Sequence, residues 1–173
     1  MNRSRVISVI RRGLPWLAFA IGVLWLTRGA RPGAHFPVGS QLPPFTAQLS
    51  DGSSFTLGPS LPQVVVLTFW ASYCVPCRAE APVLSAIQSP DIRVLGLSVE
   101  DLPATQVAAQ ARALGMRYPV GNAAPSLLTR FRVGAVPTTY VIARDGTVVL
   151  SRVGAVSSNE LREALASARR RAG

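Results

Sequence analysis

The apolar positions of the chain fall into runs whose length and spacing predict strands that alternate with helices. Two runs are continuous and rich in β-branched and aromatic residues, QVVVLTFW over 63–70 and IRVLGLSV over 92–99. Such runs are typical of strands that are covered on both faces of a sheet. Shorter strands are predicted beside turn residues, over 45–49, 54–57, 118–120, 138–143 and 147–153.

Four segments between or after these strands have the start and stop signals of helices. They are 76–87, 103–114, 126–131 and 158–171, the last with Ser157 or Ser158 as its N-cap. Strands and helices alternate, and two strands pair as a hairpin before the final helix. This order predicts an α/β domain whose mixed central sheet is flanked by helices. A chain of 173 residues suits one such domain, which we place at 42–173, plus a short appendage.

The appendage contains an apolar run over 14–27 that is flanked by arginines. The run has about 14 residues, fewer than the ~20 that a helix needs to cross a bilayer, although Trp16 and Trp25 lie where interfacial aromatic residues are expected. We predict an uncleaved signal-anchor or transmembrane helix within 1–31, then a Pro- and Gly-rich tether over 32–41. Four arginines before the run and two after it predict a single-pass protein of a bacterial inner membrane, with its domain in the periplasm. Secretion after signal cleavage is the alternative.

The net charge of +10 raises the question of a nucleic-acid partner. All the basic residues are arginines, of which six flank the N-terminal apolar run and three lie together at 169–171. The domain itself is therefore only modestly basic. Anionic lipid explains arginines beside a membrane segment, so we expect no nucleic-acid partner.

The chain has two cysteines, Cys74 and Cys77, at the junction between the strand 63–70 and the following helix. Pro76 suits the first helical position, because a proline there loses no hydrogen bond. The free N–H groups and partial positive charge of a helix N-terminus stabilise a thiolate, which is the attacking species in disulfide exchange. We therefore predict Cys74 as the nucleophile and Cys77 as the resolving thiol.

Three other interpretations of the cysteines are weaker. A structural disulfide across so short a loop would add little stability. A zinc site needs four ligands, and beyond the two cysteines the chain offers one histidine, His35, in the tether, so no metal is expected. Two buried cysteines acting as small apolar residues would not need a helix start.

Two segments carry a resemblance to a known family. FWASYCVPCRAEAP at 69–82 and VGAVPTTYVI at 133–142 resemble the active-site segments of thioredoxin-like proteins, most closely the TlpA/ResA/DsbE-like branch, over about 42–168. The resemblance implies a thioredoxin fold with an N-terminal β-hairpin and an extra helix–strand insertion. It also implies a redox-active Cys74–Cys77 disulfide and a cis Val136–Pro137 bond facing it. The residues that it places against a substrate are Trp70, Tyr73, Val75, Pro76, Val136 and Pro137.

Glu80 lies one helical turn after Cys77. In the ResA-like branch a carboxylate there would tune the thiols or exchange protons with them; the other interpretation is a solvated helix residue. Thioredoxins carry a buried Asp six residues before the first Cys, where this chain has Thr68, so Glu80 is the remaining local candidate. For Glu100 and Asp101, past a strand end, a solvated turn is favoured over partner contacts.

The predicted function is an extracytoplasmic thiol–disulfide oxidoreductase that reduces or exchanges disulfides in periplasmic proteins, in cytochrome c maturation or related redox homeostasis. Its partners would be disulfide-bearing proteins and a transmembrane electron donor. No cofactor is needed, because the dithiol carries two electrons. The alternatives are a dithiol oxidant, a copper-handling module of thioredoxin-like fold and a redox-inert interaction module.

Overall fold

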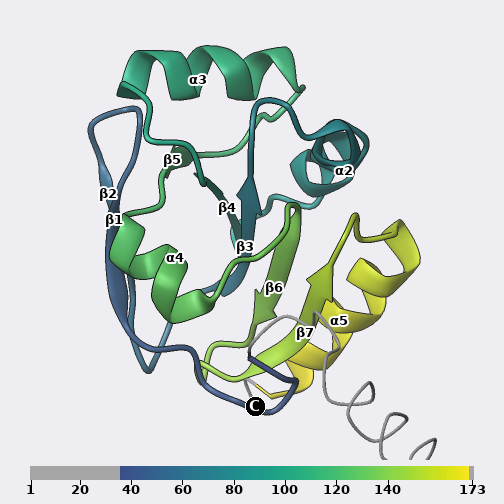
Figure 1. The fold of residues 1–173 in the computed structure, drawn as a ribbon. Helices are drawn as coiled ribbons and strands as arrows, with labels where there is room; N and C mark the ends of the chain where they lie inside the picture. Colours follow the sequence, from purple (N-terminus) through teal and green to yellow (C-terminus); the bar gives the residue numbers. More distant parts are fainter. Residues whose placement is uncertain (1–35, 172–173) are drawn as a thin grey trace, which may run out of the picture. The chain divides into compact units, whose positions relative to one another are not determined.

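The computed structural model of the chain describes residues 36–171, so the predicted membrane segment and His35 lie outside the described part. Within 36–171 no helix is long and apolar enough to span a membrane. The elements, labelled in Figure 1, are β1 (Phe45–Gln48), β2 (Ser54–Leu57), β3 (Val64–Trp70), α2 (Val75–Ala86), β4 (Ile92–Ser98), α3 (Ala104–Ala113), β5 (Val120–Asn122), α4 (Pro125–Phe131), β6 (Thr138–Ile142), β7 (Val148–Val153) and α5 (Ser158–Arg170).

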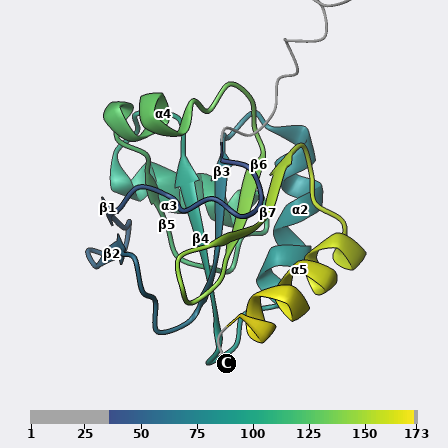
Figure 2. The ribbon, with the colours of Figure 1, turned by 90° about the horizontal axis from the view of Figure 1, so that it is seen from below.

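The main sheet has five strands in the order β5-β4-β3-β6-β7. Strands β3, β4 and β5 run parallel, whereas β6 is antiparallel to both β3 and β7. The first two strands form a separate antiparallel hairpin, β1–β2. Helices α2 and α5 lie on one side of the sheet, and the hairpin and α4 lie on the other (Figures 1 and 2). This is the mixed α/β arrangement, with an N-terminal hairpin, that the sequence predicts.

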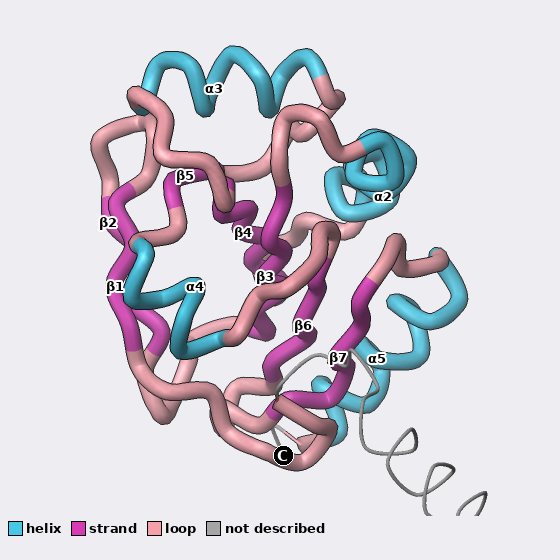
Figure 3. The backbone as a smooth tube through the Cα atoms, viewed as in Figure 1, coloured by secondary structure: helices cyan, strands magenta, loops and turns pink. Residues whose placement is uncertain are grey.

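Strand β3 is central and completely buried, as its continuous apolar run predicts. Its alternate residues point to opposite faces of the sheet. Val64, Val66 and Trp70 pack in one cluster with α2 and α5, while Leu67 and Phe69 pack in a second cluster with the hairpin and α4. Because both faces are covered, the end of β3 is held firmly, and a short loop leads from it to α2 (Figure 3).

Most element boundaries differ from the prediction by one or two residues, and the shifts of α2 and β5 have a clear physical reason. Helix α2 begins at Val75, so Pro76 occupies the second position instead of the first; an N–H is free of intrahelical partners at both positions, which is why proline fits either. Strand β5 lies two residues later than predicted. Its backbone pairs with β4 through Val120, Gly121 and Asn122, and Gly121 also forms a bridge with Leu49 that no local sequence pattern indicates.

The described part of the predicted tether, residues 36–41, contacts the domain. The ring centroids of Phe36 and Phe131 are 5.1 Å apart. The N–H of Gly39 donates to the carbonyl of Val148, and the N–H of Val148 donates to the carbonyl of Ser40, both at 2.8 Å. These residues hold a short segment, with a turn at Val38 and Gly39, beside β7, where the pattern of prolines and glycines predicts only a linker.

Candidate active site

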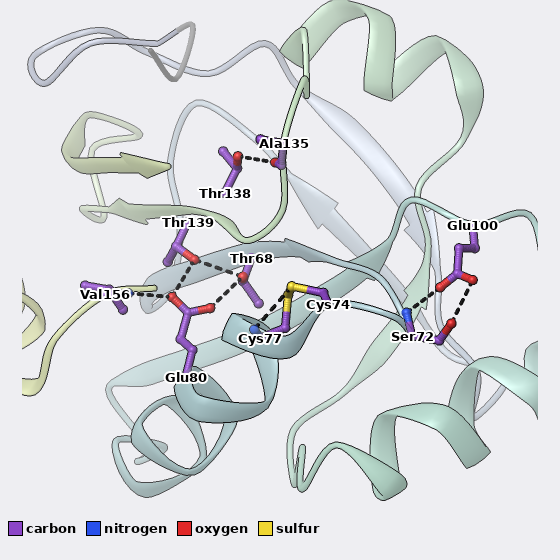
Figure 4. The surroundings of a disulfide bond; sticks show 10 residues. All are labelled: Thr68, Ser72, Cys74, Cys77, Glu80, Glu100, Ala135, Thr138, Thr139 and Val156. Carbon is purple, nitrogen blue, oxygen red and sulfur yellow. Dashed lines mark hydrogen bonds between the residues drawn. A yellow bond between two sulfur atoms is a disulfide. The ribbon is translucent and has the colours of Figure 1, made fainter. Parts of the chain in front are cut away.

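Cys74 and Cys77 are joined by a disulfide at the N-terminus of α2 (Figure 4). Cys74 is the N-cap residue, and its Sγ accepts a hydrogen bond from the N–H of Cys77 at 3.2 Å. That N–H is one of the four at the start of a helix that have no intrahelical partner. The sulfur of Cys74 therefore lies where a thiolate would be stabilised by both a hydrogen bond and the helix dipole.

The disulfide is almost buried but has an exposed apolar rim. Cys74 and Cys77 are only 4% and 1% exposed, whereas Tyr73 and Val75 on either side of Cys74 are 72% and 79% exposed. In the described part of the chain one other large apolar side chain is comparably exposed, that of Val38. Tyr73, which the resemblance places against a substrate, is thus open to solvent beside the disulfide.

The remaining residues predicted to face a substrate divide into two groups. Pro76 is exposed, and Val136 is partly exposed next to the buried Pro137, to which it is joined by a cis bond. Trp70 differs from the prediction, because its side chain is completely buried in the core. It belongs to the same buried apolar cluster as Cys74 and Cys77 and has no surface that a substrate could touch.

Glu80 lies on α2, one turn beyond Cys77, and its carboxyl group is enclosed by three elements (Figure 4). The hydroxyl of Thr68 on β3 donates to Oε2 at 3.3 Å. Oγ1 of Thr139 on β6 lies 3.1 Å from Oε1. The N–H of Val156, in the loop before α5, also donates to Oε1 at 3.0 Å. With only 2% of Glu80 exposed, the interpretation as a solvated helix residue is wrong.

Burial dominates the electrostatics of Glu80. Loss of solvent raises the pKa of the carboxyl group above its ordinary value, and the hydrogen bonds of Val156, Thr139 and Thr68 offset part of that effect. Burial of the Tyr118 hydroxyl likewise raises the pKa of Tyr118, and the negative charge of an ionised Glu80 would add to this effect. Glu80 is thus a buried acid one helical turn from Cys77, with a pKa that burial raises above the ordinary value.

The loop that precedes Cys74 is fixed by Glu100, a contact that the sequence does not reveal. One carboxylate oxygen of Glu100 accepts from the N–H of Ser72, and the other accepts from the Ser72 hydroxyl at 2.9 Å. Glu100 follows the end of β4, which lies beside the end of β3 in the parallel pair. The prediction of a solvated turn is therefore incorrect for Glu100, because its carboxylate binds the backbone N–H and the hydroxyl of Ser72, 28 positions earlier in the chain.

Within residues 36–171 no three side chains of the His, Cys, Asp or Glu type cluster as metal ligands would. A mixed sheet with a Cys-x-x-Cys pair at the start of the helix after β3 defines a thioredoxin-like protein of the thiol–disulfide oxidoreductase class. The chain belongs to the AhpC/TSA family, whose sequence model matches residues 38–151.

Similar proteins carry the same class of activity in their names. Thiol-disulfide oxidoreductase ResA of Geobacillus thermodenitrificans is 27% identical over 135 residues, which cover 75% of this chain and 77% of that protein. Among solved structures, a thiol:disulfide interchange protein of the thioredoxin family from Chlorobium tepidum is 25% identical with a TM-score of 0.65, covering 76% of this chain and 97% of that one. A secreted disulfide oxidoreductase from Mycobacterium tuberculosis is 26% identical with a TM-score of 0.58, covering 71% and 95%.

Proposed function

We propose that the protein works outside the cytoplasm, where it reduces or exchanges disulfides in other proteins. The position of Cys74 as the N-cap of α2 carries the proposal of disulfide exchange. A thiolate at this position is stabilised by the helix N-terminus and needs no cation beside it. The extracytoplasmic location is supported by the arginine-flanked apolar run at 14–27 and by the secreted relative from Mycobacterium tuberculosis. Anchoring in the membrane through that run is part of the proposal.

The reaction on a substrate disulfide proceeds in two displacements. The Cys74 thiolate attacks one substrate sulfur, the substrate disulfide breaks, and the released substrate sulfur takes the electron pair and a proton. Cys77, once deprotonated, then attacks Cys74 in the mixed disulfide. The second substrate thiol leaves, and the Cys74–Cys77 disulfide forms. Two electrons pass from the dithiol to the substrate, so the protein itself needs no cofactor.

Glu80 would exchange protons with Cys77 in this cycle. As a carboxylate it would accept the proton of the Cys77 thiol before the second displacement. As an acid it would return a proton to Cys77 when a donor reduces the disulfide. The support for this role is the burial of Glu80 on the same helix face one turn from Cys77, since a buried carboxyl group has a pKa closer to that of a thiol.

The partners follow from the direction of electron flow. A reductant in an oxidising compartment would need a membrane protein that delivers electrons, and its substrates would include periplasmic proteins such as apocytochromes c. The same displacements run backwards give a dithiol oxidant, and the reduction potential against the compartment decides between them.

A trapping experiment in the native host tests this function. Cys77→Ser leaves Cys74 able to attack but removes the resolving thiol, so mixed disulfides with substrates should accumulate and be identifiable by mass spectrometry. The double variant Cys74→Ser, Cys77→Ser is the control and should trap nothing. If the folded, expressed Cys77→Ser protein traps no partner through Cys74, the proposed function fails.

A further inference from the structure

A groove of about 460 Å³ lies between α2 and the loop that follows α3. The residues that line it include Arg78, Pro82, Ser85 and Ala86 from the helix and Leu114 and Arg117 from the loop. Arg78 and Arg117 bring two positive charges to the groove, and none of the described residues that line it is acidic. The groove is therefore basic, with apolar side chains beside its charges.

The backbone of Arg117 is held against α2. The N–H of Arg117 donates to the hydroxyl of Ser85 at 3.1 Å, and the side-chain amide of Gln88 donates to the carbonyl of Arg117 at 2.8 Å. The Ser85 hydroxyl in turn donates to the carbonyl of Ala81 at 2.7 Å. These bonds use only the backbone of Arg117. Its side chain therefore starts from a fixed place next to the helix that carries Arg78.

Neither arginine of the groove has an acidic partner in the part of the chain that the structure describes. Three other arginines there, Arg144, Arg152 and Arg171, form ion pairs with acids. The side chains of Arg78 and Arg117 form no ion pair and no hydrogen bond within residues 36–171. Both guanidinium groups are thus available to the carboxylates of another molecule, which they can bind through charge-assisted hydrogen bonds.

The groove continues the exposed surface beside the disulfide. Val75, Arg78, Pro82 and Ser85 are spaced three, four and three residues apart, so they lie on one face of α2. Val75, at the start of this face, is 79% exposed next to Cys74. Pro82 lies about 10 Å further along the helix axis, a length that about three residues of an extended chain would span. A partner whose sulfur faces Cys74 therefore reaches the groove within a few residues.

We propose that the groove binds an acidic segment of the protein that exchanges disulfides with Cys74, with its carboxylates about two to five positions from the reacting cysteine. The inference rests on the proposed function. A membrane surface with anionic headgroups suits the groove less well, because it would also cover Val75 and close the approach to the disulfide.

Binding to the oxidised, full-length protein in non-ionic detergent tests the groove without thiol chemistry. The probe is a fluorescent peptide with serine in place of the reacting cysteine and two glutamates, at the third and fourth positions, on each side of it. The matched peptide has glutamine at these four positions. At low salt the wild type should bind the acidic peptide at least about fivefold more tightly, and salt should weaken this preference.

The double variant Arg78→Gln, Arg117→Gln should bring the two dissociation constants within about twofold of each other. The matched control is Arg162→Gln, Arg169→Gln, which removes the same charge from exposed positions on α5. It should retain the preference. Equal affinity of the wild type for the two peptides would overturn the proposal, and so would a control variant that loses the preference as fully as the groove variant. Displacement of the acidic peptide by dioctanoyl-phosphatidylglycerol at a tenfold lower concentration than by unlabelled peptide would overturn it in favour of lipid.

Exchange kinetics separate this inference from the proposed function. The same peptides, with cysteine restored as a mixed disulfide with thionitrobenzoate, are added to the reduced protein. Attack of the Cys74 thiolate on the peptide sulfur releases coloured thionitrobenzoate. The ratio of the rate constants, acidic over glutamine peptide, should be about five in the wild type and about one in the groove variant. A wild-type ratio of one would overturn the groove while exchange stands. If neither peptide reacted, exchange would fail and the binding result alone would decide on the groove.

Discussion

Thr68 on β3 donates a hydrogen bond to Glu80 on α2, with 3.3 Å between Oγ1 and Oε2. Thr68 stands six residues before Cys74, where thioredoxins carry a buried Asp. In this chain the buried acid comes from the helix, and the strand position carries a hydroxyl that supports it. The two residues together define the environment from which the pH-dependent predictions follow.

Glu80 should make the stability of the oxidised protein fall with rising pH. Burial raises its pKa in the folded protein above the 4.5 expected for the unfolded chain. Its contribution to the free energy of unfolding is therefore fully present below about pH 4.5 and is lost as the pH rises through the folded-state pKa. Urea unfolding across this range should show the decline, and Glu80→Gln should remove it.

Three acids at the surface make the free energy of unfolding change with pH in the opposite direction, and they do so at lower pH. Hydrogen bonds from Ser53 lower the pKa of Asp51, those of Thr147 lower that of Asp145, and those of Ser157 lower that of Glu160. Their contributions are lost as the pH falls through these lowered values, in wild type and variant alike. A decline above pH 4.5 that persists unchanged in Glu80→Gln would contradict the assignment of that decline to Glu80.

The pH dependence of thiol exchange should also depend on Glu80. Removing its ionisable group by Glu80→Gln takes away the proton acceptor proposed for Cys77, so the rate at which the mixed disulfide resolves should fall near neutral pH by about tenfold or more. Stopped-flow measurement of resolution from pH 5 to 9 gives the profile. Identical profiles for the wild type and the variant would remove Glu80 from the reaction.

Tyr73 and Val75 should bind protein substrates. Both are largely exposed beside Cys74, and covering two apolar side chains contributes enough free energy to change kcat/KM by about tenfold. Tyr73→Ser combined with Val75→Ser should therefore slow the reduction of a protein disulfide by about that factor, while the rate with a small aromatic disulfide should change little.

Val38→Ser is the matched control, because Val38 is 64% exposed but belongs to the segment beside β7. It should leave both rates unchanged. If Val38→Ser slowed the reduction of the protein substrate as much as the double variant does, the effect would come from exposed apolar surface in general and not from Tyr73 and Val75.

Glu100 should stabilise the loop before the cysteines. Glu100→Ala removes both hydrogen bonds to Ser72, one of which satisfies a partly buried backbone N–H, so the free energy of unfolding should fall by about 1–2 kcal/mol. Asp101→Ala, at the exposed neighbouring position, should change it by less than about 0.5 kcal/mol. Equal effects of the two substitutions in urea unfolding would show that the Ser72 contacts add nothing.

The sequence predicts the elements well because the signals are local. The run at 63–70 specifies a strand buried on both faces, and Cys74, Val75 and Pro76 specify a helix start after it. The bridge between Leu49 and Gly121, and the contact of Phe36 with Phe131, join segments far apart in the chain. No periodicity within either segment contains that information, so β5 and the end of the tether were not predicted correctly in detail.

The candidate site also has some features that follow from the local sequence and others that depend on contacts between distant segments. The positions of Cys74 and Cys77 follow from spacing, but the state of Glu80 depends on Thr139 and Val156, which β6 and the loop before α5 bring to it. Glu100 reaches Ser72 only because β3 and β4 end side by side. One sequence signal could have indicated Glu100. It is a polar residue just after β4, the strand that runs parallel to β3, and β3 leads to the cysteines.

The division of labour between the two cysteines is the central claim, and their reactivity as single thiols tests it most directly. Cys77→Ser leaves only Cys74, and Cys74→Ser leaves only Cys77. At neutral pH, each variant is mixed with a small aromatic disulfide, and the second-order rate constant is measured. Cys74 should react at least about tenfold faster, because its thiolate is stabilised at the start of α2 and the thiolate is the attacking species. Equal rates, or a faster Cys77, would contradict the assignment of Cys74 as the nucleophile.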